Sequence, residues 1–202
     1  MAGPGACRLM SILTVCYEFQ YVMAILKILK YPEPALKKVA SPVRDFGAKT
    51  IQLVNDMLET MYAAPGVGLA APQVGVSQRV VVLDTDHENP GQQVYKLINP
   101  VITHAEGSVI WEEGCLSVVD FTADVKRAAQ VQVSAFDEQQ KEIKIEAEGL
   151  LAVALQHEID HLDGKLFIDR ISRLKRELYS RKRIKSLRSG VEPAHESAHI
   201  MI

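Results

Sequence analysis

The chain has 202 residues, 48% of them hydrophobic and 24% charged, which is enough for one soluble globular domain with its own core. Its formal net charge of −2 gives no overall electrostatic attraction to nucleic acid. No apolar run is long enough to span a membrane. The three cysteines, with Cys115 far from the other two, exclude a disulfide framework and favour a reducing, cytoplasmic setting.

The two ends of the chain differ in character from its middle. Residues 1–22 contain only two charged side chains and lack the features of a secretory or organellar signal. We expect them to be a dispensable N-terminal extension, with a short N-terminal anchor as the alternative. Residues 23–188 are expected to form a single domain, and residues 189–202 a flexible tail.

The first regular element is a helix predicted over 50–63, where Ile51, Val54 and Leu58 recur at helical spacing. The segment that follows, 66–75, is rich in glycine and alanine, and no strand is expected to precede it. Small residues let a backbone approach another group closely, and Gln73 is its single amide side chain. We interpret this segment as the wall of a site; a flexible surface loop is the alternative.

Most of the middle of the chain is predicted to be β-structure. The β-branched run 79–84 indicates a strand, and alternation of apolar and polar residues predicts a hairpin from 130–137 and 141–148. Two further strands are expected at 94–98 and 101–104, separated by Asn99-Pro100.

The stretch from Gln156 to His161 is where chemistry is first expected. An apolar run precedes it and Asp163-Gly164 follows it, which predicts a buried helix. On a helix, His157 and His161 stand four residues apart on one face, so both imidazoles can reach one metal ion. Glu158 lies beside them, where a general base belongs. A core helix with two hydrogen-bonded histidines is the alternative.

A second copy of the same pattern starts at His195 and ends at His199. It follows a proline near the end of the chain and has no apolar face to bury. Because a metal site needs a packed scaffold, we do not expect this copy to function.

A last helix is predicted over 172–188. Leu174, Leu178, Ile184 and Leu187 form an apolar stripe that we expect to pack on the domain. The rest of the helix is basic, with a single acidic residue, Glu177. That basic face is either a solvated surface or a contact for an anionic partner.

A catalytic metal usually takes three protein ligands. Among the remaining candidates are His87, His104 and Cys115. Cys115 lies in the segment from Trp111 to Ser117, directly after a glycine, and a thiolate is a strong ligand. A lone cysteine is more often an inert core residue, but a His-Glu-x-x-His helix in the same chain weakens that interpretation.

Three segments, taken together, resemble the peptide deformylases of the bacterial type. That family carries a Gly-x-Gly-x-Ala-Ala-x-Gln segment, a Glu-Gly-Cys-x-Ser segment and a Gln-His-Glu-x-Asp-His helix. The chain has all three in this order, at 66–73, 113–117 and 156–161, and the resemblance covers roughly residues 23–188. It implies an α+β fold, with mixed or antiparallel β-sheets around a central metal-binding α-helix and a C-terminal α-helix.

The resemblance also implies an activity: hydrolysis of the formyl group from N-formylmethionyl nascent polypeptides. Cys115, His157 and His161 would hold one divalent metal ion, with iron(II) expected and zinc, nickel or cobalt as alternatives. Glu158 would be the general base, while Gln73 and the Leu116 N–H would stabilise the negative oxygen that develops.

The methionine side chain of the substrate needs an apolar wall. Leu150, Val153 and Ala154 share a helix face with His157, and Val67, Gly68, Trp111 and Glu113 are expected to complete the substrate site. Glu113 is also expected to form an ion pair with Arg127 that fixes the cysteine segment. The family often has proline where Val119 and Lys126 stand, which puts preferences on the peptide side in doubt.

Two other functions are compatible with part of the sequence. A zinc metallopeptidase shares the histidine helix but normally takes its third ligand downstream of it. A non-catalytic ribosome-binding module would not need Glu158 or Cys115. For an enzyme of the resembled family, we expect a monomer whose basic helix over 172–188 contacts the ribosome.

Overall fold

The computed structural model describes residues 24–64, 66–86 and 88–190. The predictions for residues 1–22, for His87, for the second His-Glu-x-x-His copy and for nearly all of the tail lie outside these residues. In chain order, the described elements are η1 (Pro34–Lys37), α1 (Ala48–Ala63), β1 (Gly68–Ala70), η2 (Ala71–Val74), β2 (Val80–Asp84), β3 (Val94–Glu106), β4 (Val109–Cys115), β5 (Val118–Arg127), β6 (Gln130–Phe136), β7 (Glu142–Glu148), α2 (Gly149–Leu162), η3 (Phe167–Asp169) and α3 (Arg173–Ser189).

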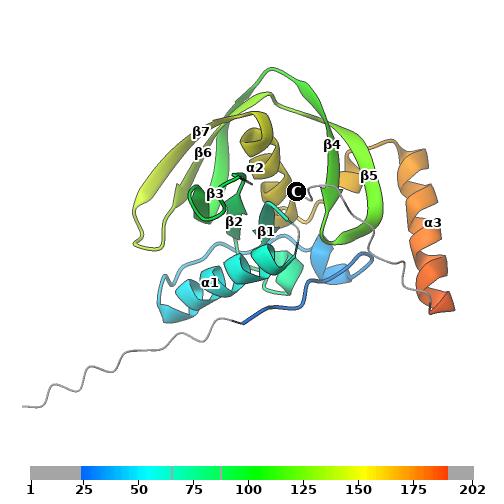
Figure 1. Ribbon diagram of the computed structural model, residues 1–202, viewed down its shortest axis with the longest axis horizontal. Coiled ribbons are helices and arrows are strands. Elements are labelled where there is room, and N and C mark those ends of the chain that lie inside the picture. The colour runs from blue at the N-terminus through cyan, green and yellow to red at the C-terminus, as the bar shows by residue number, and fades with distance from the viewer. Residues whose placement is uncertain (1–23, 65, 87, 191–202) are drawn as a thin grey trace, which may run out of the picture.

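An antiparallel sheet of five strands, in the order β1-β2-β3-β6-β7, forms one side of the molecule (Figure 1). The strands β6 and β7 alternate between buried and exposed residues, as the sequence predicted. Val131, Val133 and Ala135 of β6 are buried, while their polar neighbours in the strand face outward. The inward residues pack against α2 in one hydrophobic cluster. The α+β class and the antiparallel sheets are therefore confirmed.

The interruption expected in the third strand is wrong. β3 runs without a break from Val94 to Glu106. Asn99-Pro100 lies inside the strand, where the pairing with β6 shifts register between Ile98 and Val101. Asn99 adopts a positive φ of 55°, and its side chain bonds both the N–H and the carbonyl of Val43. These bonds tie the irregular part of β3 to the backbone of the segment before α1.

A second, two-stranded sheet was not predicted. β4 and β5 form an antiparallel hairpin that stands apart from the main sheet. Figure 1 shows α2 lying between this hairpin and the main sheet. A helix covered on both sides is buried nearly all round, and every residue of α2 from Ala152 to Leu162 is buried. Its buried polar residues therefore need partners inside the protein or a bound group.

The last helix, α3, runs beside the hairpin (Figure 1), and its packing differs from the prediction. The proposed stripe is exposed: Leu174 by 68%, Leu178 by 58%, Leu187 by 44% and Ile184 by 38%. Tyr179 and Arg183 are buried instead. Tyr179 stacks on Phe121 of β5, at 4.7 Å between ring centroids. Arg183 donates from Nε to the Tyr31 carbonyl at 3.1 Å.

Among the described residues, no helix is long and apolar enough to cross a membrane.

Candidate metal centre

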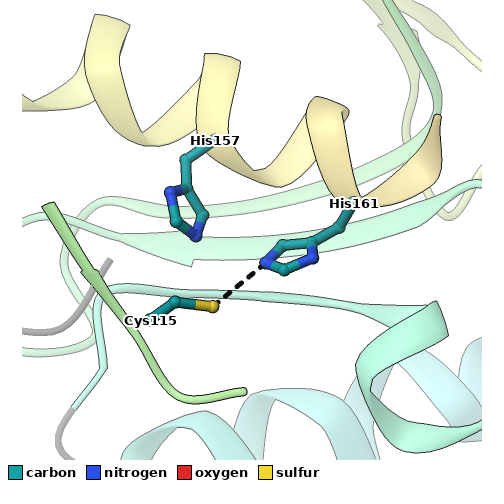
Figure 2. Close-up of side chains that lie close together, drawn as sticks. All are labelled: Cys115, His157 and His161. Carbon is teal, nitrogen blue, oxygen red and sulfur yellow. Dashed lines mark hydrogen bonds between the residues drawn. The ribbon is translucent and has the colours of Figure 1, made fainter. Parts of the chain in front are cut away.

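Two elements bring three metal-ligating side chains together. α2 carries His157 and His161 on one face, and the end of β4 delivers Cys115 opposite them (Figure 2). One ligand atom from each residue lies within 4.8 Å of the others, and all three side chains are buried. Cys115 Sγ is 3.3 Å from His161 Nε2. The cluster matches the set of ligands predicted from the sequence and has the size of a single-ion site.

The orientation of His157 is fixed from behind by a buried ion pair. Its Nδ1 lies 2.8 Å from Glu113 Oε2, which turns Nε2 toward the centre of the cluster. Glu113 in turn accepts two bonds from Arg127, from Nε at 2.6 Å and from Nη2 at 2.8 Å. A carboxylate behind a ligating histidine is the usual arrangement around protein-bound metals.

Several buried polar atoms at the centre have no hydrogen-bond partner among the described residues. They are His157 Nε2, His161 Nδ1 and both carboxylate oxygens of Glu158. Buried polar groups are normally satisfied, so such a concentration of unpaired atoms indicates a site that receives something from outside the chain. A divalent cation with water fits, because two imidazole nitrogens and one thiolate are suitable donors for it.

The acid–base properties of the centre follow from its burial. Burial, followed by the negative charge of Glu113, raises the pKa of Glu158 well above its usual range. Burial, followed by the charge of Glu158, also raises the pKa of the Cys115 thiol. Burial, and then His157, lowers the pKa of His161, which keeps its imidazole neutral. The metal-free centre therefore favours uncharged groups, and the positive charge of a bound cation would favour both the thiolate of Cys115 and the ionised carboxylate of Glu158.

Burial also opposes the charged form of Glu113, but hydrogen bonds from Arg127 and His157 outweigh it and lower the pKa of this carboxyl. Glu113 therefore stays ionised behind His157 while Glu158 tends to hold a proton. Two buried carboxyls in one small centre thus have opposite tendencies, as expected where one is structural and the other exchanges protons.

Gln73 lies at the edge of the same centre. Its Oε1 accepts from the Ala70 N–H at 2.7 Å, which fixes the amide plane. Its Nε2 donates to Ser117 Oγ at 3.2 Å and lies 3.7 Å from Cys115 Sγ. The Ser117 N–H also points at Cys115 Sγ, at 3.4 Å.

The extended segment 29–31 ties these two site segments together. Leu29 N–H donates to the Gln73 carbonyl at 2.7 Å, and Tyr31 N–H donates to the Ser117 carbonyl at 2.8 Å. Lys30 Nζ donates to the Leu116 carbonyl at 2.5 Å. The sequence gave no sign of this link.

The close approach expected in the glycine-rich segment occurs at Gly68 of β1. A Cβ on Gly68 would lie 2.6 Å from Glu158 Oε1 and 2.8 Å from a methyl carbon of Leu83. No side chain fits there, so glycine is what allows the Glu158 carboxyl to rest against the β1 backbone.

The residues predicted for the substrate site differ in how deeply they are buried. Val67, Val153 and Ala154 are buried in the cluster beneath α2, and Trp111 and Leu150 pack partly buried against it. Glu113 is not part of this cluster. It is fully buried, and both of its oxygens are used by Arg127 and His157, so its carboxylate supports His157 and its place in the substrate site stays a prediction.

The family model for polypeptide deformylases matches residues 25–177, and these include the metal centre and the segments around it. The chain belongs to the polypeptide deformylase family. This result decides against the zinc metallopeptidase, and the position of Cys115 upstream of the histidine helix agrees with it.

This chain aligns with two curated peptide deformylases over nearly all of their length. The protein from Thermodesulfovibrio yellowstonii is 54% identical over 160 residues, which is 79% of this chain and 97% of that protein. The one from Syntrophobacter fumaroxidans is 49% identical over 168 residues, 83% of this chain and 99% of that protein.

Solved peptide deformylase structures share the fold. The Legionella pneumophila structure is 46% identical, with a TM-score of 0.78, and covers 85% of this chain and 100% of its own. The Ehrlichia chaffeensis structure in complex with actinonin is 37% identical, with a TM-score of 0.76, and covers 82% and 99%.

Within this deformylase centre, sequence reasoning missed three contributions. Ser117 bonds the Gln73 amide, and Gln156 exchanges bonds with the backbone of Ala128 at 2.9 and 3.0 Å, which fixes α2 to the end of β5. Asp160 accepts from Arg127 at 2.5 Å. All three lie inside the segments 113–117 and 156–161 that resemble the family. Their closeness in sequence to the ligands could therefore have indicated a supporting role.

Proposed function

We propose that Cys115, His157 and His161 hold one divalent metal ion, and that this chain uses it to hydrolyse the formamide of N-formylmethionyl peptides. The reaction class comes from the family: peptide deformylases remove the N-formyl group from nascent peptides, and the chain is a metal-dependent hydrolase of this type. The observation that carries the residue assignment is the convergence of three buried ligand atoms within 4.8 Å of one another.

In such a site, a divalent cation supplies Lewis acidity and lowers the pKa of a water molecule that it binds. The metal we propose is iron(II), with zinc, nickel or cobalt as alternatives. Two imidazoles and a thiolate suit all four ions, so this choice rests on the resemblance to the family rather than on the ligands.

Glu158 is the proton carrier in this proposal. Its carboxyl is buried beside the ligands and unpartnered among the described residues, and burial raises its pKa. It accepts a proton from the attacking water as the new C–O bond forms. It then gives that proton to the amine nitrogen as the C–N bond breaks, which releases formate and a free amino terminus.

Gln73 and Leu116 are the proposed donors to the oxygen that becomes negative during the attack. The Gln73 Nε2 donates to Ser117 Oγ and also lies 3.7 Å from Cys115 Sγ, at the centre itself, and Oε1 is fixed by the Ala70 N–H. Leu116 directly follows Cys115 in the chain, so the proposal places its N–H near the ligand sulfur. Donors fixed in advance in a buried centre stabilise such a charge most effectively.

The methionine side chain of the substrate is proposed to lie against Leu150, Val153 and Ala154 of α2, with Val67, Gly68 and Trp111 opposite. Leu150 and Trp111 keep some exposure at the edge of the buried cluster, which supports an opening there. An apolar wall of this kind suits an unbranched side chain.

We also propose that this enzyme acts in the cytoplasm as a monomer and contacts the ribosome through α3. The helix carries six exposed basic residues: Arg173, Lys175, Arg181, Lys182, Lys185 and Arg188. Its exposed leucines stand among them, so the surface offers both charge and apolar area. Ribosomal RNA attracts such a surface through salt-dependent phosphate contacts.

The test of the activity is a side-by-side assay with formyl-Met-Ala-Ser and unformylated Met-Ala-Ser. The proposal predicts formate release from the first peptide and no cleavage of either peptide chain. Cleavage of an internal peptide bond, or no formate from metal-loaded protein, would contradict it.

A further inference from the structure

We propose that Arg170 is a positioning residue for His157, acting through an alternating series of buried charges made by Asp160, Arg127 and Glu113. The inference rests on the proposed role of His157 as a metal ligand. Arg170 lies outside the three segments that identified the site. It stands between η3 and α3, ten positions after Asp160.

The contacts in this series are continuous. Arg170 bonds Asp160 twice, from Nε to Oδ2 and from Nη2 to Oδ1 at 2.5 Å. Arg127 Nη1 donates to the same Oδ2 of Asp160 at 2.5 Å, while its Nε and Nη2 bond both oxygens of Glu113. Glu113 Oε2 then reaches His157 Nδ1 at 2.8 Å. Each charged group therefore contacts only groups of opposite charge along the series.

Burial makes the charge balance of this series matter. The side chains of Glu113 and Arg127 are 0% and 1% exposed, and that of Asp160 is 6% exposed. Arg170, at 39%, reaches solvent. Two carboxylates and two guanidinium groups sum to zero charge. Removing one member of a buried charged group leaves an uncompensated charge, which is costly.

Asp160 Oδ2 is the acceptor that Arg170 and Arg127 share. Loss of Arg170 is therefore felt by Arg127 through Asp160. Without Arg170, Arg127 alone must compensate Asp160 as well as Glu113. Its planar guanidinium cannot keep ideal geometry to both carboxylates once Asp160 gains freedom. The bond from Glu113 then fixes His157 less well. Losing a group that bonds a ligating histidine directly, as Glu113 does, commonly changes metal affinity by about 10-fold to 100-fold, so weakening that bond from Arg170 should act at the lower end of this range.

Neighbouring charges do not offer a replacement. The nearby cations Lys37 and Arg176 both pair with Asp169, the neighbour of Arg170 in sequence. Lys37 donates to its carboxylate, and Arg176 lies 3.5 Å from it. Lys165 is directed to Asp160 only through its backbone N–H, which bonds the Asp160 carbonyl at 2.9 Å. Within the described residues, the Asp160 carboxylate has side-chain bonds from Arg127 and Arg170.

The experiment compares full-length protein loaded with cobalt(II) in three forms: wild type, Arg170→Met and Arg173→Met. Arg173 is the matched control, because it is 84% exposed and, within the part of the chain that the structure describes, pairs only with Glu177 on the surface of α3. Metal release to an excess of chelator and the visible spectrum of the bound cobalt are measured. We expect about ten-fold faster release and an altered spectrum for Arg170→Met, and wild-type values for Arg173→Met.

A second pair of variants tests charge balance separately from fold. Arg170→Met combined with Asp160→Asn leaves Glu113 and Arg127 as a neutral pair, so metal release should become slower than in Arg170→Met alone. Arg170→Lys keeps the charge but loses the two-pronged bond, and should release metal at an intermediate rate. If Arg170→Met does not fold, the rate of metal release from Arg170→Lys tests the proposal in its place.

Two results would overturn the inference: wild-type release and spectrum in Arg170→Met or Arg170→Lys, or faster release in the double variant than in Arg170→Met. Its failure is separable from failure of the proposed function. In the first case the wild type still binds cobalt and releases formate, whereas in the second it does neither.

Discussion

Glu158 is the residue whose environment says most about the reaction. It is fully buried, its two oxygens are unpartnered among the described residues, and a backbone glycine makes room for it. An isosteric amide cannot exchange a proton, so Glu158→Gln should lower the rate of formate release by at least about 100-fold. Metal content measured on the same protein should match wild type. A near-native rate would remove Glu158 from its role as proton carrier.

The same residue should make the metal-free protein less stable at neutral pH. The pKa of Glu158 is raised in the folded state, first by burial and then by Glu113. Folding therefore takes up a proton between the unfolded value of about 4.3 and the higher folded value, so stability falls as pH rises through that interval. Glutamine does not ionise and escapes this cost.

Metal-free Glu158→Gln should consequently melt at a higher temperature than metal-free wild type at about pH 7.5, and the difference should shrink toward pH 4. Thermal unfolding followed by circular dichroism across this range measures it. A difference that stayed constant with pH would assign the gain to packing rather than to ionisation.

At the level of single residues, the sequence was informative where spacing alone determines geometry. The four-residue interval between His157 and His161 requires one helix face, and the structure places both imidazoles there. Glu113 shows the limit. The sequence placed this glutamate both in the substrate site and in an ion pair with Arg127. Only the structure, which pairs it with Arg127 fourteen residues later on the neighbouring strand, shows where its carboxylate points.

At the level of elements, α3 illustrates why amphipathic patterns can mislead. Its apolar stripe predicted one buried face, but the buried residues are Tyr179 and Arg183. Tyr179 supplies a large aromatic surface to Phe121, and Arg183 finds a carbonyl acceptor on Tyr31. Neither partner can be identified from the helix alone, since one comes from β5 and the other from the segment before η1.

The burial of Arg183 also changes how the α3 surface should be tested. Reversing that residue would damage packing, so the informative variant is Arg181→Glu, Lys182→Glu and Lys185→Glu, all at exposed positions. It should weaken co-sedimentation with ribosomes at low salt, because fewer phosphate contacts are available. Turnover of a free formylated tripeptide should not change, since these residues lie away from the metal centre.

The matched control reverses three exposed lysines elsewhere: Lys38, Lys141 and Lys144. It changes the net charge equally but leaves α3 intact. Equal loss of co-sedimentation in both variants would indicate a general charge effect, and no loss in the α3 variant would leave its basic face simply solvated.

The β4–β5 hairpin was the element that sequence patterns did not reveal. Its inner residues serve three tasks, since Trp111 packs toward α2, Glu113 supports His157 and Cys115 is a proposed ligand. A strand that carries buried polar groups loses the simple apolar alternation on which strand prediction depends. Elements shaped by a site are therefore the ones that propensity alone describes least well.

At the scale of the whole molecule, the fold assembles the centre from segments far apart in the chain. The main sheet supports one side of α2, the β4–β5 hairpin closes the other, and segment 29–31 links Gln73 to the cysteine loop. Matching segments in the right order were enough to predict the family and the antiparallel α+β fold. The separation of the hairpin from the main sheet depended on long-range packing and was not predictable.

The central claim is that Cys115, His157 and His161 hold the metal on which deformylation depends. The most direct measurement is formate release from formyl-Met-Ala-Ser as metal-free protein is titrated anaerobically with iron(II), in wild type and in Cys115→Ser. The account predicts no activity without metal, a plateau at one equivalent for wild type, and weaker binding with lower activity for Cys115→Ser, because a neutral hydroxyl is a poor ligand. Activity in metal-free protein, or identical titrations for the two proteins, would contradict it.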